Sequence, residues 1–127
     1  MQQVSENVFV ETGFRGCNPG IVVVPGGVVM IDTPQRPGDA LAWREFVLSK
    51  GRPLYLIHTE AHTDHVVGDH YFPEPVLVCH EGIPGRLPTT PELFQPIKER
   101  AASEPGALPP VDCYELRPHR ITFATRM

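Results

Sequence analysis

The sequence predicts an α/β fold in which short strands alternate with helices in layers. Two β-rich runs, 20–24 and 28–32, flank the turn residues Pro25-Gly26-Gly27 and indicate a hairpin or a small meander. An amphipathic helix is expected next, and two further short apolar runs, 54–57 and 76–79, read as strands. This alternation favours the layered class over a helical bundle or a sandwich made of sheets alone.

The elements of the first half follow from local signals. Residues 7–10 are β-rich and precede the hairpin. Asp39 is a suitable N-cap for the helix, and Gly51 is a suitable end. The helix carries three apolar residues on one face, with Phe46 beside them: Ala40, Trp43 and Val47. We expect this face to cover a sheet.

The central part combines apolar strands with a polar, histidine-rich segment. The run 54–57 is short and continuously apolar, which is typical of a strand buried on both faces. The histidine-rich segment begins where that strand ends. Residues 65–72 are expected to form a short helix before Pro73, and the strand 76–79 comes after it.

The last third is less regular. The sequence Thr89-Thr90-Pro91-Glu92 resembles a capping box, but Pro96 would disturb the helix that it starts. Residues 103–110 are expected to form a loop. Residues 120–127 are consistent with one further strand, for which the sequence supplies no evident partner.

Bulk composition limits the classes of function. A chain of 127 residues suits one domain, and a net charge of −4 provides no basic stripe for nucleic acid. The longest apolar runs fall far short of the roughly 20 residues of a membrane span, and no signal peptide is evident. The three cysteines form no Cys-x-x-Cys pair, which suits reduced, buried thiols. We therefore expect a cytoplasmic protein that binds neither nucleic acid nor a membrane.

The residues from His58 to His65 contain three histidines, one glutamate and one aspartate. Imidazole and carboxylate are ligands of zinc, iron and manganese. If the preceding strand continued, alternation would place His58, Glu60 and His62 on one side. The zincin motif His-Glu-x-x-His does not fit, because the glutamate is not in its second position.

At this segment the sequence resembles the metallo-β-lactamase superfamily, whose motif is His-x-His-x-Asp-His, preceded by Thr and followed by x-Gly-Gly. The stretch Thr59-Glu60-Ala61-His62-Thr63-Asp64-His65-Val66-Val67-Gly68 matches this frame except at Glu60 and Val67. The strand ending in Ile31-Asp32-Thr33-Pro34 also resembles the family's early Asp-Thr turn. The resemblance extends from about residue 7 to about residue 80.

The resemblance implies a metal site. His62 would be a ligand of the first metal, while Asp64 and His65 would hold the second. Glu60 stands where the family has its first histidine, and a carboxylate there can still ligate zinc. His58 is a further candidate for that ligand. Asp64 would also be the catalytic residue that orients the attacking water or takes up its proton. Asp32 is expected to form hydrogen bonds rather than to ligate.

The resemblance covers only the N-terminal half of the family's αββα sandwich. Nothing after His65 matches the later ligands, and His119, the only late histidine, lies in a segment unlike the family's ligand loops. We therefore expect residues 1–127 to be a partial domain, inactive alone, of a metal-dependent hydrolase. Such an enzyme would use one or two zinc ions, or iron or manganese, to cleave an ester, amide, lactone, thioester or phosphoester.

Two alternatives remain open at this point. One is a mononuclear iron enzyme of the persulfide-dioxygenase type found in the same superfamily. The other is an inert fragment whose unpaired sheet edge is open to self-association.

Overall fold

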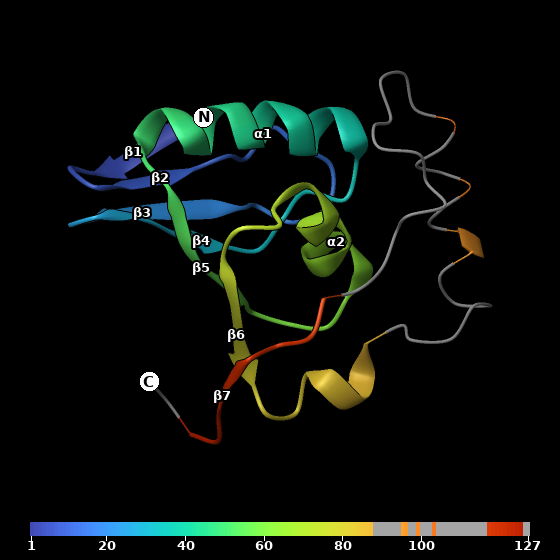
Figure 1. Cartoon of the computed structure of the whole chain (residues 1–127). Coiled ribbons are helices and arrows are strands. Elements are labelled where there is room, and N and C mark those ends of the chain that lie inside the picture. Colours follow the sequence, from blue (N-terminus) through green and yellow to red (C-terminus); the bar gives the residue numbers. More distant parts are fainter. Residues whose placement is uncertain (88–94, 97–98, 100–102, 104–116, 126–127) are drawn as a thin grey trace.

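The computed structural model describes residues 1–87, 95–96, 99, 103 and 117–125 (Figure 1). The capping box at 89–92 and nearly all of the expected loop 103–110 lie outside the described residues. Within them, one seven-stranded sheet follows the order of the chain. The strands are β1 (Gln2–Ser5), β2 (Val8–Val10), β3 (Gly20–Val24), β4 (Gly27–Ile31), β5 (Pro53–His58), β6 (Val76–His80) and β7 (Ile121–Phe123). The helices are α1 (Pro37–Lys50), α2 (Thr63–Val66) and the 3₁₀ turns η1 (Val67–Tyr71) and η2 (Pro84–Arg86).

The sheet has an antiparallel part and a parallel part. Strands β1 to β4 pair antiparallel, each with the next. Strands β5, β6 and β7 then add in parallel to β4. Because parallel strands point the same way, the segments that follow β4, β5 and β6 leave the sheet at one edge. The Asp-Thr turn and the histidine-rich segment therefore begin side by side.

One face of the sheet carries the main core, beneath α1 and η1. Trp43 of α1 is fully buried, with Phe46 stacked on it at 5.5 Å and Phe14 edge-on at 6.4 Å. The buried core on this side comprises Ile21, Val28, Met30, Ala40, Trp43, Val47, Leu56, Val67, Tyr71, Phe72 and Leu77. The expected apolar face of the helix, with Trp43 at its centre, is confirmed.

The opposite face is also apolar but less covered. The register aligns Val22, Val29, Tyr55 and Val76 in one row across four strands. Tyr55 is 42 % exposed, and Ile121 in the neighbouring row is 43 % exposed. This alternation between a buried and a half-exposed apolar face explains why β5 reads as a continuous apolar run.

Several boundaries differ from the sequence-based expectation. The strand β1 was not predicted, because its residues are all exposed and give no apolar alternation. The helix α1 begins at Pro37, with Arg36 rather than Asp39 at the N-cap, since proline is well suited to the first helical turn. The C-terminal strand was predicted without a partner, and this was wrong: β7 pairs in parallel with β6.

None of the helices that the structure describes has the length and hydropathy of a membrane span.

Candidate metal centre

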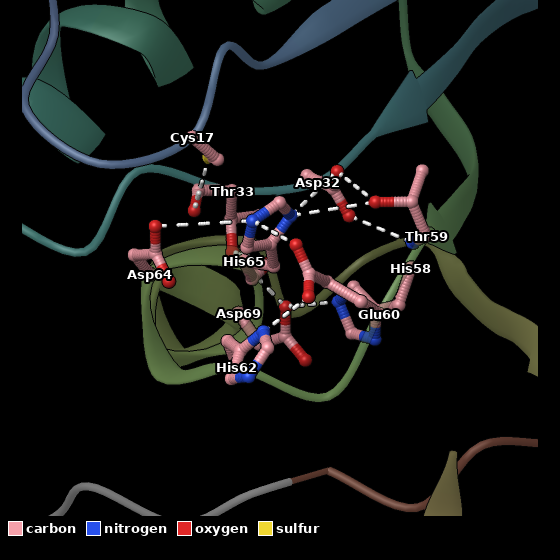
Figure 2. A network of polar contacts seen from close by, with 10 residues as sticks. All are labelled: Cys17, Asp32, Thr33, His58, Thr59, Glu60, His62, Asp64, His65 and Asp69. Carbon is pink, nitrogen blue, oxygen red and sulfur yellow. Dashed lines mark hydrogen bonds and ion pairs between the residues drawn. The ribbon is translucent and has the colours of Figure 1, made fainter. Parts of the chain in front are cut away.

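The candidate site lies where β4 and β5 end (Figure 2). Asp32 directly follows β4, and its backbone N–H donates to the carbonyl of Ile57 on β5 at 2.9 Å. Its φ of 54° lies in the left-handed region, which aspartate and asparagine adopt more readily than most residues. This turn directs the Asp32 side chain across the ends of both strands.

The carboxylate of Asp32 accepts three hydrogen bonds although the residue is only 4 % exposed. Thr59 donates its backbone N–H at 2.9 Å and its hydroxyl at 2.6 Å. The third contact joins Asp32 Oδ2 to His65 Nδ1 at 2.9 Å. Because a carboxylate only accepts, Nδ1 carries a proton in this contact, and the other ring nitrogen, Nε2, is directed into the site. The expectation that Asp32 forms hydrogen bonds is confirmed.

The four residues predicted to bind metal, Glu60, His62, Asp64 and His65, are linked by contacts in this region. His65 Nε2 is 2.8 Å from Glu60 Oε1 and 3.8 Å from Asp64 Oδ2. The second oxygen of Glu60 contacts His62 Nδ1. His62 precedes α2, and Asp64 and His65 lie in its single turn, so the short helix brings these side chains to one end of the sheet.

Two glycines permit the close packing around this helix. A Cβ on Gly68 would lie 2.2 Å from the carbonyl oxygen of Pro34, which is impossible without movement. A Cβ on Gly16, where φ is +105°, would lie 2.9 Å from Cβ of Asp64. Both positions let the backbone approach the site more closely than another residue would allow.

His58 does not join the site. The strand ends at this residue, and its side chain turns inward, leaving it 1 % exposed, whereas the side chain of His62 is 79 % exposed. The shared side for His58, Glu60 and His62 was expected only if the strand continued through them, and the strand ends at His58. His58 Nε2 is instead 2.8 Å from Asp69 Oδ1, and burial raises the pKa of Asp69.

His119 was not identified from the sequence as part of a network. Its Nε2 is 2.6 Å from His58 Nδ1, although 61 residues separate the two histidines. Burial, together with the charge of His58, lowers the pKa of His119 to about 4. The only sequence signal was indirect: a histidine ending an apolar strand needs a buried partner.

The surroundings of the site are strongly negative. Burial raises the pKa of the Cys17 thiol to about 12, and the charges of Asp32, Asp64 and Glu60 act in the same direction. Cys17 is therefore an inert, buried thiol that donates to the carbonyl of Thr33 at 3.4 Å, as its sequence context predicted. Three carboxylates gathered around one imidazole favour a bound cation.

The donor types fit a divalent metal, but the donors now pair with one another. In the described part of the chain, no group of three or more His, Cys, Asp or Glu side chains is arranged so that it could hold a metal ion. Both oxygens of Glu60 are engaged by imidazoles. Glu60 and His62 are well exposed, so rotation of their side chains is sterically open. His65 needs no such change, because Asp32 already orients it.

A pocket of about 440 Å³ lies beside these residues. It is lined by Thr59, Glu60, Ala61 and His62 from the loop after β5, by His80 at the end of β6, and by Gly82, Ile83 and Arg86 from the segment that follows. The candidate metal ligands Glu60 and His62 therefore form one wall of a cavity large enough for a small molecule.

Comparison with known proteins identifies the fold. No known protein family matches the sequence, and no curated protein matches it. Among solved structures, a metallo-β-lactamase from Hirschia baltica aligns with 99 % of this chain and 52 % of its own, at 17 % identity and a TM-score of 0.59. One from Pontibacter korlensis aligns with 99 % of this chain and 53 % of its own, at 18 % identity and a TM-score of 0.52.

A comparison that covers less of the chain gives the same fold. The sec-alkylsulfatase Pisa1 from Pseudomonas sp. aligns with 65 % of this chain and 15 % of its own, at 19 % identity and a TM-score of 0.55. The chain therefore has the metallo-β-lactamase fold, as predicted, and it spans about half the length of the lactamases that it matches.

Proposed function

We propose that this chain carries the metal-binding part of a metal-dependent hydrolase. In this proposal Glu60, His62, Asp64 and His65 hold one or two divalent cations, with zinc as the first choice. The observation that carries the proposal is the orientation of His65. A buried carboxylate fixes its Nδ1, while Nε2 faces two further carboxylates. A histidine ligand held by a carboxylate in this way is a common arrangement at zinc sites.

The donor set suits zinc, iron(II) or manganese(II). It combines imidazoles with carboxylates and contains no free thiolate, since Cys17 is protonated at neutral pH. Glu60 in place of a histidine adds one negative charge and favours harder metals. A bound cation would supply Lewis acidity and a water of lowered pKa at this site.

The chain's own residues have separable roles in the proposal. Asp32 and Thr59 hold the His65 ring through partly buried contacts. Asp64 is partly exposed beside His65 and would accept a proton from the attacking water. The pocket next to Glu60 and His62 would hold the substrate, a small molecule with a hydrolysable ester, amide, lactone, thioester or phosphoester bond.

Zinc titration of the full chain tests the metal site. We expect stoichiometric binding by isothermal titration calorimetry, weakened at least tenfold by His65→Ala and by Glu60→Gln. Glu45→Gln, which removes an exposed carboxylate on α1, serves as the matched control and should bind zinc like the unmodified chain. Zinc binding that is absent, or equal in all variants, would contradict the proposal.

Turnover is a separate question, because the chain spans only about half of the lactamases that it matches. Assays with generic lactam, ester and phosphodiester substrates, with and without zinc, would test whether these residues suffice for catalysis. The inert alternative predicts no metal-dependent turnover. Metal analysis after anaerobic purification would distinguish the iron alternative, since stoichiometric iron without zinc would overturn the hydrolase proposal.

A further inference from the structure

The pocket beside the candidate site has two chemically different walls. One wall, from the loop after β5, includes Glu60 and His62. The other wall comes from the end of β6, the segment after it and the turn η2, and includes His80, Ile83 and Arg86. Since neither His80 nor Arg86 belongs to the proposed ligand set, this second wall requires its own explanation.

His80 has no free nitrogen to offer a ligand. Its Nδ1 accepts the backbone N–H of Gly82 at 3.0 Å, so Nε2 carries the proton and donates to the carbonyl of Ala124 at 3.2 Å. The ring therefore shapes the loop that joins β6 to η2. Ile83, which is buried, adds an apolar surface to the same wall.

Arg86 lacks the kind of side-chain contacts that Arg44 and Arg117 make. Arg44 pairs with Glu74, and Arg117 donates to the carbonyls of Phe72 and Pro75. Within the described residues, Arg86 has no side-chain hydrogen bond or ion pair, and its side chain lines the pocket while remaining exposed. Among the described residues that line the pocket, it is the one with a permanent positive charge. Its guanidinium can therefore contact a ligand in the pocket.

We propose that this pocket binds a substrate through an anionic group, a carboxylate, sulfate or phosphate, that Arg86 holds. The guanidinium presents paired donors that match the oxygens of such groups. Glu60, which lines the same pocket from the loop after β5, repels the anion, so the two charges orient the substrate within the pocket. The anion lies at Arg86, and the bond to be cleaved lies at the Glu60 and His62 end. That last placement rests on the proposed function, whereas anion binding by Arg86 does not.

Anion titration of the metal-free chain tests the inference without requiring activity. Sodium sulfate, sodium phosphate and sodium acetate would be titrated separately at constant ionic strength, balanced with sodium chloride, while ¹⁵N-resolved NMR follows the amides of Gly82 and Ile83 and the Arg86 side chain. We expect saturable shifts at these positions with at least one anion, and the preferred anion identifies the substrate class.

Three variants make the result specific. Arg86→Ala should weaken binding at least tenfold, and Arg86→Lys should restore part of it by returning the charge without the paired donors. Arg52→Ala removes another exposed arginine, at the opposite end of β5, and should bind like the unmodified chain. Shifts that do not saturate, or that survive unchanged in Arg86→Ala, would overturn the inference.

Failure of this inference and failure of the proposed function are distinguishable. Sulfate binding that depends on Arg86 in a chain that does not bind zinc would support the pocket and reject the metal site. Zinc binding that depends on His65, together with anion binding that does not change in Arg86→Ala, would support the metal site and reject the anion pocket.

Discussion

Replacing Asp32 by asparagine should separate the stability of the site from its capacity to bind metal. Asparagine has nearly the same shape and tolerates the left-handed backbone at this position. It keeps one oxygen to accept the N–H of Thr59, but it presents an NH₂ group where the carboxylate accepted from His65. His65 can satisfy that donor only by accepting at Nδ1. The ring proton then lies on Nε2, so the nitrogen that faces Glu60 and Asp64 no longer has a lone pair for a metal.

The expected cost in stability is moderate. Three hydrogen bonds accepted by a carboxylate are replaced by one that the neutral amide accepts and two that its NH₂ group donates, which lowers the free energy of unfolding by about 2 kcal/mol. Asp32→Ala should cost about 4 kcal/mol, because it leaves buried donors unsatisfied and places a Cβ-bearing residue without a polar side chain at positive φ. Urea unfolding followed by circular dichroism measures both values.

The same substitution should also weaken metal binding. We expect Asp32→Asn to weaken zinc binding by about 10- to 100-fold, as is typical when the partner of a ligating histidine is lost. Long-range ¹H–¹⁵N NMR should show His65 Nδ1 protonated in the unmodified chain and unprotonated in the variant. An unchanged tautomer, or zinc affinity equal to that of the unmodified chain, would refute the assignment of Asp32 as the residue that orients His65.

Three further predictions concern stability. Trp43→Ala should lower the free energy of unfolding by about 3–5 kcal/mol in urea titrations, because it empties the centre of the core under α1. Gly68→Ala should destabilise by more than 1 kcal/mol in the same assay, since its Cβ meets the carbonyl of Pro34; a neutral result would mean that η1 can shift. The pKa of His119 is lowered to about 4 in the folded protein, so the folded state binds fewer protons than the unfolded state between about pH 4 and pH 6.5. Stability should therefore fall as the pH drops through that window, by about 1–2 kcal/mol after allowing for partial exposure, and His119→Asn should flatten this part of the profile.

Much of the fold was predictable because its signals are local. The turn at Pro25-Gly26-Gly27 joins β3 to β4 as expected, and the apolar spacing around Trp43 placed the helix against the core. The Asp-Thr turn and the motif from Thr59 to Gly68 were correctly associated with one fold. What the motif alone did not reveal was which side chains contact one another, since this depends on how β4 and β5 align.

The errors have a common physical origin in long-range pairing. Alternation predicted that His58 shares a side with Glu60, but the strand ends at His58 and the chain then turns into the loop before α2. His119 was set aside because its neighbours resemble no ligand loop. Its contact with His58 results from the parallel pairing of β7 with β6, which no local pattern encodes.

The two kinds of pairing in the sheet also imply an order of assembly. Strands β1 to β4 join neighbours that are close in sequence, whereas Val78 of β6 must find Ile121 of β7 across a much longer stretch of unfolded chain. Closing that longer stretch costs more chain entropy, and β7 offers only three residues of pairing in return. We therefore expect β7 to dock last and to open first in hydrogen exchange. The contact between His58 and His119 would then report the final step of folding.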